Sequence, residues 1–326
     1  MVVLAIGVTP DTVLAKEAGL ELGIKESIVV NDRMETSVPD IYAAGDAVQV
    51  KHYVTGNDAL ISLAGPANKQ GRIIADNICG GDSRYLGSQG SSVIKVFDMT
   101  AATTGINETN AKKSGLEVDT VILSPMSHAG YYPGGKVMTM KVIFEKESYR
   151  LLGAQIIGYE GVDKRIDVLA TAIHAGLNAT QLKDLDLAYA PPYSSAKDPV
   201  NMAGFMIDNI AKGTLKQWHL EDMDKISKDK DVVLLDVRTV GEFSRGHIDG
   251  FKNIPVDELR ERISEIEKGK PVYLICQSGL RSYIASRILE GNGYETYNFS
   301  GGFRFYDAVV NDRALIERAY ACGMDY

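Results

Sequence analysis

Cys276 has the sequence surroundings of a nucleophile. It ends the apolar run PVYLIC, which predicts a buried strand, and it is followed by QSGLRS and a helical pattern. In open parallel sheets, ligand sites lie beyond the carboxyl ends of the strands. A short loop with a glycine that enters a helix directs backbone N–H groups and the helix dipole at one point, and Arg281 would add a positive charge there. These features favour the thiolate over the thiol, so we expect Cys276 to be reactive.

Two other interpretations of Cys276 stay open. A buried cysteine is often a small apolar core residue without chemistry. A cysteine-dependent phosphatase also combines a cysteine, a loop and an arginine. Only four residues separate Cys276 from Arg281, however, and the smaller ring fits one sulfur atom better than a tetrahedral phosphate.

Three motifs, one of which begins with Cys276, resemble the rhodanese family. They are LLDVRTVGEFSRGHIDGFKNIP, CQSGLRS and SGGF, in this order between residues 234 and 303. The resemblance implies that Cys276 accepts sulfane sulfur as a persulfide and that the following residues cradle the anion, namely Gln277, Ser278, Gly279, Leu280 and Arg281. It also implies scaffold and loop support from Asp236, Arg238, Glu242 and His247. Local caps and surface ion pairs are an equally open interpretation of these last four residues.

A second candidate site lies in TSVPDIYAAGDAVQV. A strand ending in Gly45-Asp46 would bring the backbone close to a ligand at the glycine and would present a carboxylate to hydroxyl groups. With AIGVTPDT before it and AGPANKQGR after it, the segment resembles the second FAD fingerprint of the pyridine nucleotide-disulfide oxidoreductases. The resemblance implies that Asp46 holds the ribityl chain. It also implies that the helix entered through Leu63, Ala64 and Gly65 directs its N-terminus at the pyrimidine end of the isoalloxazine.

The motifs AYAPPYSSAKDPVN and SHAGYYPGGK narrow the resemblance to the coenzyme A-disulfide reductase and NADH oxidase branch. A His-x-x-x-x-Glu pair, which the glutathione-reductase branch carries, is absent from the sequence. By resemblance, Tyr189 reaches the flavin site of the partner subunit in a homodimer, and Tyr131 and Lys197 contact coenzyme A, with Lys197 pairing with a phosphate. Packing or solvent exposure stays open for these three residues, and Tyr132 and Tyr193 are alternative candidates.

The chain divides into three predicted parts. Residues 1–85 contain a strand over 2–6, a helix over 12–18 and a helix from Pro66 to Gly80, and they resemble remnants of Rossmann-like NAD(P)- and FAD-binding domains. Residues 86–212 predict an antiparallel sheet with two helices, an α+β domain, and the resemblance implies that it is the dimerisation domain. Residues 213–326 alternate strands with helices, including one expected over 256–269, and predict a rhodanese-like, doubly wound α/β domain.

The nucleotide-binding parts look incomplete. No G-x-G-x-x-G motif occurs in the sequence, so we expect neither the FAD pyrophosphate site nor the NAD(P)H site. The resemblance also implies a redox-active cysteine that has no counterpart here, since Cys79 lies in the helix tail NICGG and is not a substitute, and Cys322 reads as a packing residue. We therefore expect sulfur transfer but not complete NAD(P)H-dependent reduction from this chain. A truncation and a natural remnant are both open explanations.

Composition excludes several classes of function. The chain has 326 residues, 45% of them hydrophobic and 24% charged, as in ordinary globular proteins. A net charge of −8 disfavours nucleic acid as the main partner. Three scattered cysteines predict neither disulfides nor a metal site and suit a reducing cytoplasm. No apolar run reaches the roughly 20 residues of a membrane span.

Together, these observations predict part of an FAD-dependent NAD(P)H:disulfide oxidoreductase with a rhodanese domain. Its expected substrates are coenzyme A disulfide, coenzyme A persulfide or polysulfide. A stand-alone thiosulfate or polysulfide sulfurtransferase, an NADH oxidase and a coenzyme A or persulfide sensor are the alternatives. The choice between NADH and NADPH is left open.

Overall fold

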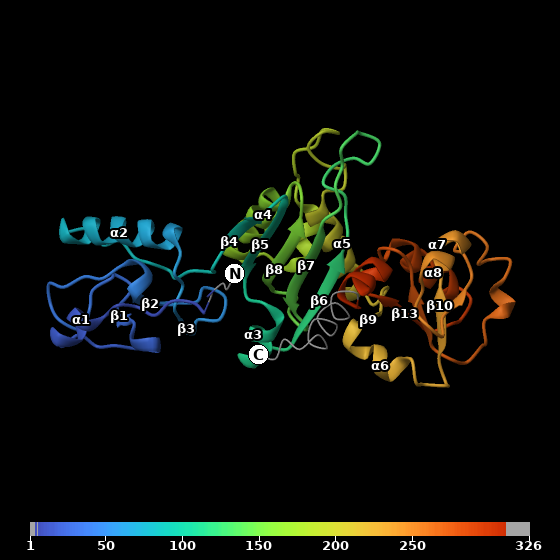
Figure 1. Cartoon of the computed structure of the whole chain (residues 1–326), viewed down its shortest axis with the longest axis horizontal. Helices are drawn as coiled ribbons and strands as arrows, with labels where there is room; N and C mark the ends of the chain where they lie inside the picture. Colours follow the sequence, from blue (N-terminus) through green and yellow to red (C-terminus); the bar gives the residue numbers. More distant parts are fainter. Residues whose placement is uncertain (1–3, 5, 311–326) are drawn as a thin grey trace.

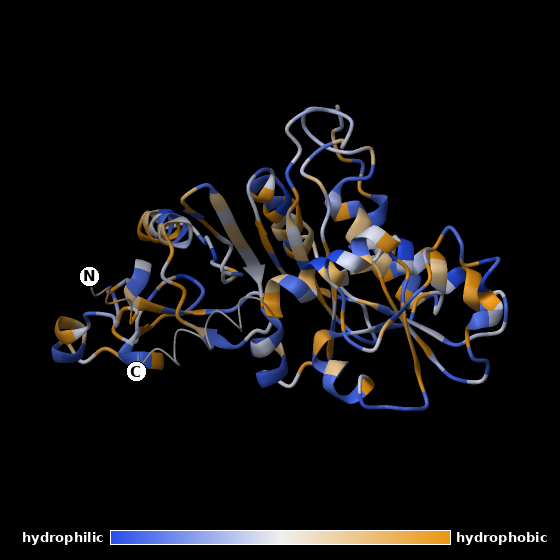
Figure 2. Ribbon diagram, turned by 45° about the vertical axis from the view of Figure 1, so that its right-hand side comes forward, coloured by the Kyte–Doolittle hydropathy of each residue, from blue (hydrophilic) through white to orange (hydrophobic). Residues whose placement is uncertain are grey.

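Three sheets organise the protein. The computed structural model describes residues 4 and 6–310, and within them the sheets follow one another along the chain. In Figure 1 the three parts lie side by side in sequence order, from blue through green to red. Figure 2 shows apolar and polar positions interspersed along the ribbon of each part, as expected when each part packs its own core.

The first part is a small three-stranded sheet covered by one helix. Its elements are α1 (Val13–Glu17), η1 (Ile24–Glu26), β1 (Ile28–Val29), η2 (Gly45–Ala47), β2 (Val48–Lys51), β3 (Asp58–Ala59) and α2 (Ala64–Ile78). Strand β2 pairs in parallel with β1 and antiparallel with β3. Ile73 and Ile74 of α2 pack on the buried Met34, Val48 and Val50. The helix predicted from Pro66 is confirmed.

Regular strand structure is absent from the described residues of two segments that the sequence predicts as strands. The run before Gly45 is not a strand, because Tyr42 makes only an isolated bridge to Glu35 and the regular strand β2 follows the Gly-Asp turn instead. Gly45 has φ +83°, and this left-handed turn ends extended pairing at that point. Of the strand predicted over 2–6, only Leu4 and Ile6 are described; both are exposed and lie outside any strand.

The middle part is the predicted antiparallel α+β domain. Its elements are β4 (Ser92–Val96), β5 (Met99–Gly105), α3 (Glu108–Lys113), β6 (Val118–Leu123), β7 (Thr139–Glu145), β8 (Leu151–Gly158), α4 (Val162–His174), η3 (Ala179–Asp184) and α5 (Pro199–Ala211). The sheet has the order β4-β5-β8-β7-β6. The sequence analysis missed β5, which is rich in threonine and small residues, and β6, whose apolar run at 121–123 is only three residues long.

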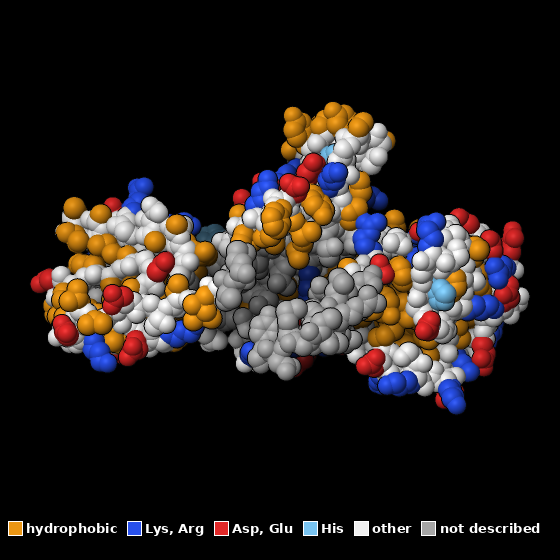
Figure 3. All heavy atoms as spheres, in the orientation of Figure 1, with side chains coloured by type: hydrophobic (Ala, Val, Ile, Leu, Met, Phe, Trp, Pro, Cys, Tyr) orange, Lys and Arg blue, Asp and Glu red, His pale blue; other side chains and the backbone are white. Residues whose placement is uncertain are grey.

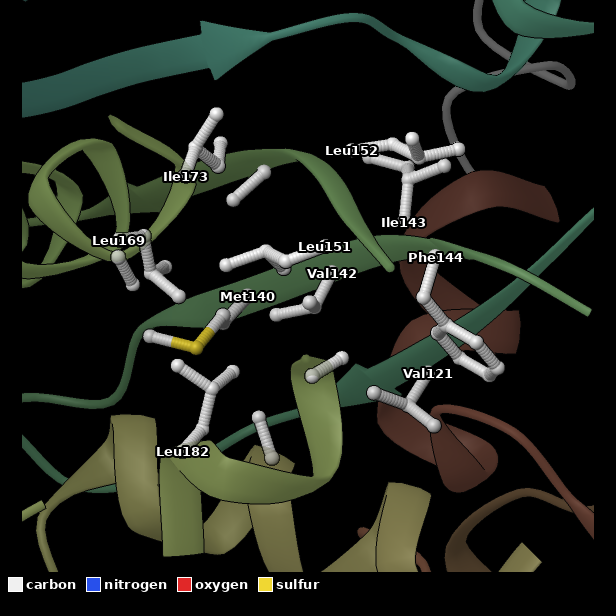
Figure 4. Packing of buried hydrophobic residues seen from close by; sticks show 14 of the residues in the cluster. Val121, Met140, Val142, Ile143, Phe144, Leu151, Leu152, Leu169, Ile173 and Leu182 are labelled. Atoms are coloured by element: carbon white, nitrogen blue, oxygen red, sulfur yellow. The ribbon is translucent and has the colours of Figure 1, made fainter. Parts of the chain in front are cut away.

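This middle sheet carries the largest core. Successive residues of a strand face opposite sides, so Met140 and Val142 share one face of β7 and Ile143 lies on the other. Figure 4 shows Met140 near Leu182, whereas Ile143 lies beside Leu152. All five side chains are buried, so the domain provides a rigid support for the loops at its edge.

The third part is an all-parallel five-stranded sheet in the order β11-β10-β12-β13-β9. Its elements are β9 (Gln217–Trp218), η4 (Leu220–Asp222), α6 (Met223–Ile226), β10 (Val233–Asp236), α7 (Val240–Arg245), β11 (Lys252–Asn253), η5 (Ile263–Glu265), β12 (Val272–Ile275), α8 (Leu280–Glu290) and β13 (Thr296–Phe299). This arrangement confirms the predicted α/β class.

The prediction of a helix over residues 256–269 is wrong. The segment forms successive turns, such as Leu259 N–H to Val256 C=O, and then the short helix η5. Leu259 and Ile266 are nevertheless buried in the core. Apolar residues three or four positions apart satisfy a chain of turns as well as a helix, so their spacing did not distinguish the two.

Hydrogen bonds join the second and third parts. Asp119 of β6 accepts a bond from Gln217 Nε2 (3.0 Å) and contacts His219 Nε2 (3.0 Å). The Ile122 N–H donates to the hydroxyl of Ser300 (3.1 Å). The segment that follows β13 is therefore anchored on the middle domain. None of the described helices has the length and apolarity needed to cross a membrane.

Candidate functional site

The sulfur of Cys276 lies in a cradle of hydrogen-bond donors. Cys276 follows β12 and is 1% exposed. Its Sγ accepts hydrogen bonds from the Gly279 N–H (3.1 Å) and the Ser282 hydroxyl (3.2 Å), at the N-terminus of α8. Gly279 has φ +98°, a conformation that other residues rarely adopt. Both donors and the helix dipole stabilise a negatively charged sulfur at this point.

Strand β13 and the segment that follows it both hold this loop in place. The Phe303 N–H donates to the carbonyl of Cys276 (2.8 Å), and Asn298 Nδ2 donates to the carbonyl of Gly279 (3.2 Å). Gly302 passes so close that a Cβ there would lie 2.7 Å from the Ser278 nitrogen. The SGGF motif therefore packs directly against the loop. Ser282, Asn298 and Gly302 were not predicted as site residues, although two of them lie in the quoted motifs.

The positive charge that Arg281 adds beside the loop is paired with a carboxylate of the same chain. The Nη1 and Nη2 atoms of Arg281 donate to the two carboxylate oxygens of Glu242, at 2.7 and 2.6 Å. Glu242 also accepts from the backbone N–H and hydroxyl of Thr239, the N-cap of α7. Chiefly because of the bond from Arg281, the pKa of Glu242 falls to about 2, and the same contact raises the pKa of Arg281.

Asp236 and Arg238 form a buried pair under the loop. The Nη2 atom of Arg238 lies 2.7 Å from the Asp236 carboxylate and also donates to the carbonyl of Gly246 (2.8 Å). The Arg238 guanidinium lies 3.8 Å from the Phe303 ring centroid, and its Nη1 makes a long contact of 3.5 Å to the Gln277 side chain. The pair is therefore buried scaffold next to the loop and not a surface ion pair.

The remaining rhodanese candidates are more exposed. Leu280 is 66% exposed, directly before Arg281. His247 stacks on Phe243 with 4.0 Å between ring centroids, and its Nδ1 lies 3.1 Å from the Phe243 carbonyl. No described hydrogen bond joins His247 to the Cys276 loop.

The candidate flavin residues lie together in the first part. The Gly45 N–H donates to Gln70 Oε1 of α2 (2.8 Å), which holds the Gly45-Asp46 turn against that helix. Within the described residues, the Asp46 carboxylate is exposed and makes no hydrogen bond or ion pair. Leu63 is the N-cap of α2 and provides no capping side chain, so the N–H groups of Ala64 and Gly65 have no hydrogen-bond partner in the part of the chain that the structure describes. A free carboxylate beside a free helix N-terminus fits the ribityl and pyrimidine portions of a flavin.

Tyr131 and Tyr189 meet at the tip of two loops that project from the middle domain. Their hydroxyl oxygens are 2.6 Å apart, and this bond with Tyr131 is the main reason why the pKa of Tyr189 is raised. Tyr131 is 77% exposed, and Tyr132 and Tyr193 are exposed too. Figure 3 shows apolar side chains gathered at this tip. Lys197 is exposed and makes no ion pair within the described residues.

A buried arginine that the sequence analysis missed joins these two loops. Arg165 of α4 donates to the Ser127 carbonyl of one loop (2.9 Å) and to the Ser194 hydroxyl of the other (3.1 Å). It also pairs with Asp198 (3.0 Å), the N-cap of α5. Arg165 is distant in sequence from both loops and lies in no quoted motif, so no local signal identified it.

The described residues contain no cluster of His, Cys, Asp and Glu side chains that could hold a metal ion. Cys79 is exposed at the end of α2, and Cys322 lies outside the described residues. Cys276 and the tyrosine pair belong to different parts of the chain, and no described contact joins them. The structure therefore presents three separate candidate sites.

Three family models match the chain. The dimerisation domain of the pyridine nucleotide-disulphide oxidoreductases matches residues 91–199, and a pyridine nucleotide-disulphide oxidoreductase domain matches residues 1–71. The rhodanese-like domain matches residues 219–308. Each match coincides with one of the three parts of the structure.

Known proteins and solved structures are similar to this chain over much of its length. A Pyrococcus abyssi protein named NAD(P)H sulfur oxidoreductase (CoA-dependent) is 38% identical over 200 residues, which are 61% of this chain and 45% of that protein. The crystal structure of reduced Bacillus anthracis CoADR-RHD is 49% identical with a TM-score of 0.92, covering 95% of this chain and 56% of that one. An NAD-dependent persulfide reductase from A. fulgidus is 42% identical with a TM-score of 0.84, covering 92% and 55%.

The chain spans about half the length of these relatives. The matches nevertheless cover all three parts of the structure, including both loops at the tyrosine pair and the Cys276 loop. The chain is built from domains of the pyridine nucleotide-disulphide oxidoreductase family followed by a rhodanese-like domain.

Proposed function

We propose that Cys276 accepts a sulfane sulfur atom and carries it as a persulfide. The observation that supports this most is the placement of its Sγ, which receives hydrogen bonds from Gly279 and Ser282 at the start of α8. Gln277, Ser278 and Leu280 complete the loop around the sulfur. The small ring between Cys276 and Arg281 suits one added sulfur atom.

The chemistry is thiol exchange. The Cys276 thiolate attacks the outer sulfur of a donor R–S–SH, a new S–S bond forms at Cys276, and the donor's S–S bond breaks. R–S⁻ leaves with the electron pair, so the step needs no external oxidant. The Gly279 and Ser282 donors stabilise the attacking thiolate and then the anionic persulfide. The buried pair of Asp236 and Arg238 keeps the loop in place.

The intact protein, on this proposal, is a flavin-dependent NAD(P)H:disulfide oxidoreductase that acts on coenzyme A disulfide, coenzyme A persulfide or polysulfide. The names of the relatives, NAD(P)H sulfur oxidoreductase (CoA-dependent) and NAD-dependent persulfide reductase, support this substrate class. Gly45, Asp46, Leu63 and Ala64 would hold the ribityl chain and the pyrimidine end of FAD. FAD, when bound, would supply the acceptor for the hydride of NAD(P)H.

Coenzyme A would bind at the loops of the middle domain. Tyr131 and Lys197 would contact it, because Lys197 offers a phosphate an ammonium group that no described carboxylate pairs with, and Tyr131 offers an exposed ring and hydroxyl. Tyr189 would reach the flavin site of a second copy, so the active unit is a homodimer formed through residues 86–212. A reducing, cytoplasmic setting suits a protein whose function needs a free thiolate.

Sulfur transfer by the chain itself tests the proposal. The purified chain should transfer sulfur from polysulfide to cyanide, and Cys276→Ser should abolish the transfer, whereas Cys79→Ser should not. Sulfur transfer that survives Cys276→Ser would contradict the assignment. Saturable coenzyme A binding without turnover would also contradict it and would indicate a sensor.

A further inference from the structure

We infer that Glu242 sets the donor specificity of the Cys276 loop by neutralising Arg281, so that the loop takes sulfur from an organic persulfide in preference to the thiosulfate dianion. The inference rests on the proposed sulfur-accepting role of Cys276. It assigns to Glu242 a positioning role, exerted through Arg281, that goes beyond support of the scaffold.

The charges around the loop support this role. A guanidinium binds a sulfonate or carboxylate best through two parallel N–H groups. In Arg281 both of these groups already donate to Glu242, at 2.7 and 2.6 Å. Arg281 is the second residue of α8, the helix whose N-terminus carries the Gly279 and Ser282 donors to the Cys276 sulfur. The cation nearest to the reacting sulfur in sequence is therefore occupied by a carboxylate of the same chain.

The second arginine beside the loop is occupied in the same way. Arg238 is buried, pairs with Asp236 and donates to the Gly246 carbonyl. Glu242 and Asp236 thus offset the two guanidinium charges. A dianion that enters the loop meets the backbone and hydroxyl donors, but neither of these two arginines offers it a free two-point contact.

Three exposed apolar side chains lie close in sequence to Glu242 or Arg281. Leu280 is 66% exposed and Ile284, one helical turn later on the same face of α8, is 44% exposed. Val240, on α7 two residues before Glu242, is 63% exposed. Burial of hydrocarbon against such side chains is favourable, and an organic persulfide has hydrocarbon to bury. Thiosulfate has none.

Both donors can react by the same balanced step. With thiosulfate, the Cys276 thiolate attacks the sulfane sulfur, the S–S bond breaks, and sulfite leaves with the electron pair. With an organic persulfide, the thiolate R–S⁻ leaves instead. The two donors differ in the charge and the hydrocarbon that the mouth of the loop must accommodate. The ratio of their half-saturating concentrations, called the donor ratio below, therefore reports on specificity and not on the chemistry of Cys276.

The test uses Glu242→Gln in the full chain. Glutamine at the third helical position also satisfies a capping box, so the variant keeps the α7 cap while it removes the charge. Persulfide formation at Cys276 is followed by mass spectrometry of quenched samples, with thiosulfate and with pantetheine persulfide. We expect the half-saturating thiosulfate concentration to fall about five- to tenfold, because the released Arg281 can form one charge-assisted hydrogen bond to the dianion, with the saturating rate unchanged. The pantetheine persulfide values should stay within about twofold.

Two further variants make the result specific. Glu242→Gln combined with Arg281→Gln restores a neutral pair, so its donor ratio should return to that of the parent protein. Glu265→Gln removes a carboxylate of similar pKa, about 2, that pairs with Arg262 in the same domain. This control should leave the ratio unchanged.

The outcomes separate this inference from the proposed function. If Glu242→Gln leaves the thiosulfate values unchanged, or if the double variant still favours thiosulfate as the single variant does, the specificity role of Glu242 is wrong although Cys276 still loads sulfur. If Cys276→Ser still acquires sulfur at residue 276 or the parent protein acquires none, the sulfur-accepting role itself is wrong.

Discussion

Arg165 and Asp198 form a buried ion pair beneath the two loops that carry Tyr131 and Tyr189. Both side chains are almost completely buried, and the Arg165 Nη2 lies 3.0 Å from the Asp198 carboxylate. Asp198 also accepts from the Ser194 hydroxyl (2.7 Å) and caps α5 through the Val200 N–H (3.0 Å). The geometry of the tyrosine tip therefore depends on one interior arginine.

Arg165→Met should destabilise the middle domain strongly. The substitution leaves the Asp198 carboxylate buried without its partner, which typically costs about 3–5 kcal/mol. Urea denaturation should show this loss in the free energy of unfolding. Hydrogen exchange should increase in the loops 127–136 and 186–197, because both lose a bond from Arg165.

Lys164→Met is the matched control. Lys164 lies 4.0 Å from the same carboxylate but is partly exposed. Such a pair contributes at most about 1 kcal/mol, so the unfolding free energy should change little. Equal losses for the two variants would contradict the account of Arg165 as the clamp between the loops.

Stability should depend on pH through Glu242. The pKa of this carboxyl is about 2 in the folded protein, mainly because of the hydrogen bonds from Arg281, against an ordinary value of 4.5. A lowered folded-state pKa gives stability that is present above pH 4.5 and is lost as the pH falls toward 2. We expect Glu242→Gln to lose about 1–2 kcal/mol at neutral pH, a figure reduced for partial solvent exposure, and little at pH 2.

Denaturation of the parent protein and Glu242→Gln across this pH range measures the difference directly. The two curves of unfolding free energy should converge as the pH falls. A difference that stays constant from neutral pH to pH 2 would show that the Glu242 charge is not coupled to folding.

The hydroxyl pair at the tip should respond to Tyr131→Phe. Removal of the Tyr131 hydroxyl removes the bond that raises the pKa of Tyr189, so this pKa should fall toward its usual value. NMR titration of protein labelled at the tyrosine Cζ atoms measures the change. Tyr193→Phe, at an exposed tyrosine of the same tip, should leave the pKa of Tyr189 unchanged. If Tyr193→Phe lowered this pKa as much as Tyr131→Phe does, the pairing of Tyr131 with Tyr189 would be contradicted.

The sequence predicted those parts of the fold and site that local patterns determine. Cys276 lies after an apolar strand and before a helix, and both elements formed as expected. Gly45 and Leu63 were likewise placed by short motifs, and the structure brings the Gly-Asp turn against α2. The helices α4 and α5 have the apolar periodicity and terminal residues that define their ends.

Local sequence patterns could not predict interactions between residues that are far apart in the sequence. Glu242 and Arg281 are 39 positions apart, so their pairing depends on how α7 and α8 meet above the sheet. Arg165 gave no signal for the same reason. The segment 256–269 was misjudged because its apolar spacing fits turns as well as a helix. The roles of Tyr131, Tyr189 and Lys197 in substrate binding stay predictions.

The fate of one sulfur atom at Cys276 tests the central claim most directly. The chain is incubated with polysulfide, freed of excess donor, digested under non-reducing conditions and analysed by mass spectrometry. The peptide that contains Cys276 should increase by the mass of one sulfur atom, lose it on treatment with cyanide, and show no increase in Cys276→Ser. Sulfur found on Cys79 and not on Cys276, or no sulfur on any peptide, would contradict the account.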